Sequence, residues 1–137
     1  MKIHTTNYFD TFIEIAEDSK VQHSEVPPQK STKTVARMLY EMIAEQPYKF
    51  TSDMVLFECF AQKNNIPEDQ KAEARNLFFS KGQACMRASA LPKRYGFGMH
   101  FNSEGKIALC PAESDEYQNF LNNPEIKKVK AMRSSRN

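Results

Sequence analysis

Residues 95–110 read YGFGMHFNSEGKIALC, and this stretch decides the fold class. From position 95 to 101, large apolar side chains alternate with glycine or histidine, which is the pattern of a β-strand with one buried face. A polar loop at 102–105 separates this strand from a second apolar run at 106–110. The stretch therefore predicts a β-hairpin, with Gly105 supplying the left-handed turn position.

The two faces of this hairpin differ in their side chains. Paired strands place residues of the same parity on one face, so one apolar set is expected in the core: Phe97, Met99, Phe101, Ile107 and Leu109. The opposite face of the first strand carries Gly96, Gly98 and His100. Because the two glycines leave bare backbone beside an imidazole, this face is expected to form a shallow trough.

Both ends of the chain are expected to contribute to the sheet. Residues 9–17 alternate β-branched and aromatic side chains with polar ones, which is typical of a half-buried strand. Residues 126–132 are apolar and basic, and they form either an edge strand or a loose tail at the start of a basic C-terminal segment, 126–137. After the first strand, Pro27 and Pro28 exclude a helix or a central strand and predict a loop.

Apolar residues recur at helical spacing in four further segments. The helices are expected at about 31–46, 51–65, 67–79 and 114–121. Ser31 or Thr32 is expected to cap the first helix, and Pro47 to end it. Together these elements predict an α+β fold, in which a small, mainly antiparallel sheet packs with three to four helices in one domain spanning 1–137.

Three strings in the chain carry a resemblance. They are HTTNYFDTFIEIAEDS at 4–19, CMRASALPKRYGFGMHFNSEGKIAL at 85–109 and IKKVKAMRS at 126–134. Together they resemble a domain-of-unknown-function family of small bacterial proteins, over nearly the whole chain. The resemblance implies a bacterial, stand-alone, single-domain protein. It implies no activity, so no catalytic residue is carried over from it.

Composition narrows the class of protein further. The 137 residues are 40% hydrophobic and 26% charged, with a net charge of +2, which excludes a disordered chain, a membrane span and a strongly cationic coat for nucleic acid. No secretory signal is visible at the N-terminus. Three cysteines, an odd number, favour a cytoplasmic protein with free thiols, and we expect no disulfide among Cys59, Cys85 and Cys110.

Positive charge is concentrated in two acid-free windows. Between Glu73 and Glu104 there are five cations and no acid: Arg75, Lys81, Arg87, Lys93 and Arg94. After Glu125 there are again five: Lys127, Lys128, Lys130, Arg133 and Arg136. Three of the four glycines lie in the first window and Gly105 directly follows it, which makes this window the candidate site.

We expect a small anionic ligand at this window. Guanidinium groups bind carboxylate and phosphate with two parallel hydrogen bonds, and three cations precede the glycine trough. The expected ligand-binding residues are Arg87, Lys93, Arg94, Gly96, Gly98 and His100. Two alternatives stay open: a helix that packs over the glycines, or Asp10 and Glu14 neutralising the arginines across the sheet.

Two other classes of function compete with a binding protein. The first is an enzyme in which Cys85, activated by nearby cations, and His100 form a nucleophilic pair. The second is a nucleic-acid-binding accessory protein, with helices near 52–62 and 67–79 imitating a helix-turn-helix. No cofactor or metal is expected, because the histidines and cysteines lack metal-ligand spacing. The oligomeric state is left open by the sequence.

Overall fold

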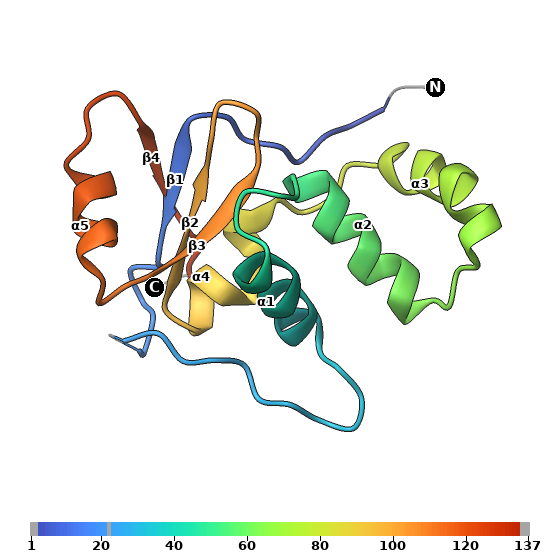
Figure 1. Cartoon of the computed structure of the whole chain (residues 1–137), viewed down its shortest axis with the longest axis horizontal. Coiled ribbons are helices and arrows are strands. Elements are labelled where there is room, and N and C mark those ends of the chain that lie inside the picture. Colours follow the sequence, from blue (N-terminus) through green and yellow to red (C-terminus); the bar gives the residue numbers. More distant parts are fainter. Residues whose placement is uncertain (1–2, 22, 135–137) are drawn as a thin grey trace.

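A computed structural model describes residues 3–21 and 23–134. Its centre is a four-stranded sheet in the order β3-β2-β1-β4, with helices on both faces (Figure 1). The strands are β1 at Thr11–Glu14, β2 at Phe97–Phe101, β3 at Ile107–Pro111 and β4 at Lys127–Lys130. β4 runs parallel to β1 and the other neighbours are antiparallel. The predicted α+β class is confirmed, and the sheet is mixed with a mainly antiparallel pattern.

Five α-helices surround the sheet in the described part of the chain. They are α1 at Val35–Glu45, α2 at Ser52–Lys63, α3 at Lys71–Phe79, α4 at Ala90–Arg94 and α5 at Asp115–Leu121. Short 3-10 turns at Glu68–Gln70 and Met86–Ala88 precede α3 and α4. α5 covers one face of the sheet, α1 and α4 lie on the other, and α2 with α3 extends away from it (Figure 1).

Local sequence explains where most helices begin and end. One helix, α4, was not expected from the sequence. The Thr51 side chain accepts a hydrogen bond from the backbone of Met54 and caps α2. Thr34, and not Ser31 or Thr32, caps α1. α4, which contains Pro92, was not predicted. Pro92 lies in the first turn of α4, where the backbone N–H that proline lacks has no helical partner anyway.

The hairpin is confirmed in position and register. Met99 pairs with Leu109 and Phe101 with Ile107, and Gly105 has a φ of +79°. Phe97, Met99, Phe101 and Ile107 are all buried in the main core, and Leu109 packs against it half-buried. The apolar face of the hairpin was therefore placed correctly from its alternation alone.

The half-buried N-terminal strand is a prediction that was wrong. β1 is shorter than expected, and both faces of it are buried. Ile13 lies in the main core, and Phe12 lies on the opposite face, where its ring centroid is 5.0 Å from that of Tyr117 in α5. The reason is the position of β1 between two other strands, with helices covering both faces at that point.

The C-terminal edge strand is confirmed, since β4 pairs with β1 over four residues. Arg87 fixes the chain that follows. Its Nε donates to the Lys130 carbonyl at 2.6 Å, and its own carbonyl accepts from the Met132 N–H at 2.8 Å. Ala131 is buried between these contacts. The last part of the predicted basic tail, 135–137 with Arg136, lies outside the described residues.

A buried polar cluster attaches the N-terminal segment to the start of α2. The Asp53 carboxylate accepts three hydrogen bonds of 2.7 Å, from the Thr5 hydroxyl and from both the backbone N–H and the hydroxyl of Thr6. Asn7 accepts from the Asp53 N–H at 2.9 Å, and the hydroxyls of Thr6 and Ser52 lie 2.8 Å apart. The string HTTN thus acts as a structural anchor.

Candidate functional site

The expected glycine trough is filled, and that prediction was wrong. A Cβ atom on Gly98 would lie 2.7 Å from Phe12 Cζ and 2.8 Å from Tyr117 Cε2. A Cβ on Gly96, which has a φ of +75°, would lie 2.8 Å from the His23 carbonyl oxygen. The glycines are needed because β1, α5 and the loop that follows β1 approach the hairpin closely. The alternative of a helix packed over this face is what the structure shows at Gly98.

His100 is held by aromatic neighbours on the same face. Its ring stacks on Phe120 of α5, with centroids 4.3 Å apart and planes at 17°. Its Nδ1 lies 2.8 Å from the Tyr48 hydroxyl oxygen. Burial lowers the pKa of His100 from its ordinary value, although the charge of Asp10 opposes this shift. The imidazole therefore serves as a packed, hydrogen-bonded part of the α5 face.

Cys85 and His100 are not brought together. Cys85 Sγ accepts a hydrogen bond of 3.2 Å from the Tyr8 hydroxyl, and the Tyr8 ring lies 5.3 Å from that of Phe101 in the main core. Phe101 and His100 are successive residues of β2, so their side chains point to opposite faces. The sheet thus separates the two groups of the proposed nucleophilic pair.

All three cysteines are free thiols. Burial raises the pKa of Cys59 to about 12 and raises that of Cys110 as well. Burial, reinforced by the hydrogen bond to Cys85, raises the pKa of Tyr8 to about 12. Cys59 and Cys110 therefore stay protonated at neutral pH, and Tyr8 stays a hydrogen-bond donor to Cys85.

Two of the predicted cations lie in a basic cleft. This cleft has a volume of about 460 Å³ and is lined by Asp18, Lys20, Lys93, Arg94 and Ser134. Lys93 and Arg94 form the C-terminal end of α4, and Asp18 and Lys20 follow β1. A backbone hydrogen bond of 3.0 Å from the N–H of Ala16 to the carbonyl of Pro92 joins these two segments.

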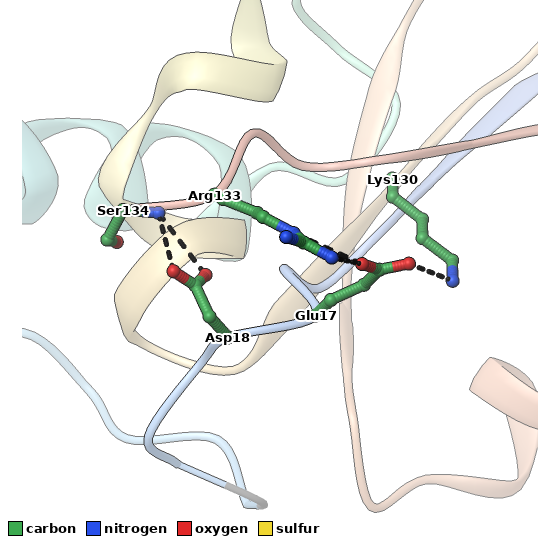
Figure 2. A network of polar contacts seen from close by, with 5 residues as sticks. All are labelled: Glu17, Asp18, Lys130, Arg133 and Ser134. Atoms are coloured by element: carbon green, nitrogen blue, oxygen red, sulfur yellow. Dashed lines mark hydrogen bonds and ion pairs between the residues drawn. The ribbon is translucent and has the colours of Figure 1, made fainter. Parts of the chain in front are cut away.

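The acidic residues beside the basic cleft are engaged by the C-terminal segment (Figure 2). Glu17 accepts from Lys130 Nζ at 2.7 Å and from an Arg133 terminal nitrogen at 2.6 Å. Asp18 accepts from the backbone N–H of Ser134 at 2.9 Å. The hydrogen bonds from Lys130 and then Arg133 hold the pKa of Glu17 at about 2. The C-terminal cations thus neutralise an acid next to the basic cleft.

This pairing leaves the basic cleft with an excess of positive charge. Within residues 3–21 and 23–134, Lys20, Lys93 and Arg94 form no ion pair with any carboxylate. The described residues that line the cleft include three cationic side chains and one carboxylate, which together carry a net charge of +2. The alternative in which Asp10 and Glu14 neutralise the arginines is not what the structure shows, since neither acid forms an ion pair with Arg87 or Arg94 in the described chain.

The sequence identified only part of this cleft. Lys93 and Arg94 were predicted as ligand-binding residues, whereas Lys20, Asp18 and Ser134 were missed. Their convergence depends on contacts between residues 116 positions apart, such as Asp18 and Ser134, and no local pattern indicates such a contact. Arg87 does not line the cleft, because its guanidinium is turned to the Lys130 carbonyl.

Acid is expected to loosen the C-terminal segment. The folded pKa of Glu17 is about 2, below its ordinary 4.5, so its ion pairs stabilise the fold above pH 4.5. That contribution is lost as the pH falls from about 4.5 toward 2. Thermal melts of wild type and Glu17→Gln should therefore differ near neutral pH and converge as the pH falls below about 4.5. Glu104→Gln, on an exposed hairpin loop, is the control; a Glu17→Gln difference that persists to pH 2 would contradict the pairing.

Comparison with known protein families gives a match over nearly the whole chain. A model of a family of unknown function, DUF6157, matches residues 3–137. The chain belongs to this family. The resemblance seen in the three sequence strings is thereby confirmed, and it brings no assigned activity. No curated protein and no solved structure matches the chain.

Two other features bear on the chemistry available to this DUF6157 protein. No group of three or more histidine, cysteine, aspartate or glutamate side chains is placed to hold a metal ion within the described residues. No helix in the same part of the chain is long and apolar enough to cross a membrane.

Proposed function

We propose that this protein is a cytoplasmic binding protein for a small anion, held in the basic cleft by Lys20, Lys93 and Arg94. The single observation that carries the proposal is the convergence of these three cations, from two segments of the chain, without a carboxylate partner in the described residues. Three free thiols support the cytoplasmic assignment, because disulfides are rare in that compartment.

The composition of the cleft favours a phosphate or carboxylate group. Arg94 offers a planar fork that matches either group with two hydrogen bonds, and Lys20 and Lys93 add compact charges. A volume of about 460 Å³ lies in the range of small-molecule sites. The net charge of +2 suits a dianion such as a phosphate monoester better than a long polyanion.

The cations of a second hollow differ from those of the basic cleft, because they are already paired. It measures about 480 Å³ between α1, α2 and α3, and it also contains cationic side chains. There Lys71 pairs with Glu58 at 3.2 Å and with Glu68 at 3.0 Å, and the Arg75 guanidinium lies 5.3 Å from the centre of the Phe79 ring. These cations already have partners, so an anion would have to displace them.

Anion binding should stabilise the fold. A ligand at one hundred times its dissociation constant adds about 2.7 kcal/mol to the free energy of unfolding. We expect phosphate, sulfate, nucleotides or small carboxylates to raise the melting temperature of the wild type, and Arg94→Ala to lose most of that response. Lys30→Ala is the matched control, because Lys30 is exposed and does not line the cleft.

Two results would count against the proposal. One is a panel in which no anion stabilises the wild type, and the other is an Arg94→Ala variant that responds as strongly as Lys30→Ala. Stabilisation by single-stranded nucleic acid alone, with a steep loss at raised salt, would favour the nucleic-acid alternative instead.

A further inference from the structure

We propose that the outer face of α3 binds a second copy of this chain, forming a symmetric dimer in which two α3 helices pack antiparallel. This surface is separate from the basic cleft and is called the α3 face. It consists of Glu73, Ala74, Leu77, Phe78 and Lys81. The proposal is independent of anion binding.

The α3 face is apolar at its centre. Leu77 is 59% exposed, and it lines two adjoining hollows of about 620 and 330 Å³. Ala74 lines both hollows as well, and the 37% exposed ring of Phe60 in α2 lines the larger one. The inward side of α3 is already used, because Phe79 is buried with Phe57 and Ala61 of α2. Ala74 and Phe78 pack partly against this cluster, so Leu77 is the apolar side chain of the α3 face that is left largely in solvent.

Charge placement identifies the occupant as a second copy. Glu73 precedes Leu77 by four residues and Lys81 follows it by four. Glu73 lines the hollow at one end of this ridge, and Lys81 lines the hollow at the other. Neither forms an ion pair within residues 3–21 and 23–134. Leu77 therefore lies between a glutamate in α3 and a lysine just beyond its end, at equal offsets along the chain.

Such a ridge is complementary to itself. A two-fold axis through Leu77 places Leu77 against Leu77 of the partner copy and puts each Glu73 opposite a Lys81 across the axis. Residues four apart form one ridge of a helix, and two such ridges can interdigitate. Ser80, the C-cap of α3, keeps right-handed helical dihedrals, with φ of −69° and ψ of −16°. Lys81 follows it directly and lines the same larger hollow as Leu77.

The size of the α3 face sets the expected strength of the dimer. Nine helical residues span only about 14 Å, and such a patch is at the low end of specific interfaces. We therefore expect a reversible dimer that dissociates on dilution, and sedimentation velocity over a range of concentrations measures it.

Charge swapping tests the pairing. Glu73→Lys and Lys81→Glu should each raise the dimer dissociation constant by roughly tenfold or more, because like charges then face each other twice. The double variant Glu73→Lys/Lys81→Glu should regain most of the wild-type affinity. Leu77→Glu should give a monomer, and because Leu77 is largely exposed its melting temperature should stay close to that of the wild type. Glu45→Lys, on the exposed end of α1, is the control for an unrelated charge change.

Three results would overturn the proposal. The first is a wild type that is monomeric at every concentration, which would leave the α3 face to a different protein. The second is a dimer that survives Leu77→Glu, which would place the interface elsewhere. The third is a double charge-swap variant that remains as weak as the single variants.

Discussion

Asp53→Ala is expected to lower the free energy of unfolding by about 3–4 kcal/mol, the largest single effect of any substitution that removes a polar group from this chain. The Asp53 carboxylate is the acceptor for the Thr5 hydroxyl and for the N–H and hydroxyl of Thr6. Thr6 is only 5% exposed, so its backbone N–H would lose its acceptor at a site with little access to water. The N-terminal segment would then carry unsatisfied donors against the start of α2.

Urea denaturation measures this effect, with Asp69→Ala as the matched control. Asp69 is exposed in the 3-10 turn before α3, and its loss should change stability by less than about 0.5 kcal/mol. The stability of Asp53→Asn should fall between those of the two alanine variants. Its carboxamide oxygen can still accept a hydrogen bond, but its NH₂ group would face donors and could not accept from them. Equal stabilities of Asp53→Ala and Asp69→Ala would show that the cluster does not anchor the N-terminus.

Gly98→Ala is expected to cost about 2–3 kcal/mol through overpacking. The added methyl group would lie within 3.0 Å of Phe12, Tyr117 and the Ile13 carbonyl oxygen. The Ile13 oxygen belongs to the central strand and cannot move without disturbing the sheet. Because Gly98 has no positive φ, the cost is purely steric. If this face of the hairpin were an open trough, the same substitution would hardly change the free energy of unfolding.

Gly82→Ala is the matched control for this steric effect. No atom lies within 4 Å of the position a Cβ would take on Gly82, and its backbone is not left-handed. The substitution should be neutral or should stabilise by up to about 1 kcal/mol, because alanine restricts the unfolded chain. If Gly98→Ala unfolds at the same urea concentration as Gly82→Ala, the close packing of α5 on the sheet is wrong.

The fold could be predicted where local pattern determines structure. Alternation fixed the apolar face of the hairpin, and Thr51 and Pro47 marked helix limits that the structure confirms. Alternation does not say what covers the second face of a strand. Phe12 and Gly98 were therefore misread, since α5 packs on a face that looked polar or bare.

The candidate site shows the same limit. Lys93 and Arg94 stand out in the sequence because no acid is near them along the chain. Whether Lys93 and Arg94 are neutralised depends on where Glu17 and Asp18 lie in space. Both acids bind the C-terminal segment through contacts between residues more than 100 positions apart. Lys20 joins the same cleft from the opposite end of the chain. Such long-range pairings have no local signature, so the acid-free window indicated the region and not the complete site.

The most direct test of the anion site is a titration of the ¹⁵N-labelled protein with inorganic phosphate, followed residue by residue in NMR spectra. We predict saturable shifts of the backbone amides around Lys20, of Lys93 and Arg94 at the end of α4, and of Ser134, with unchanged amides in α2 and α3. In Lys20→Ala the same shifts should require several-fold more phosphate. Shifts confined to other surfaces, or shifts at the basic cleft that Lys20→Ala leaves unaltered, would contradict the account.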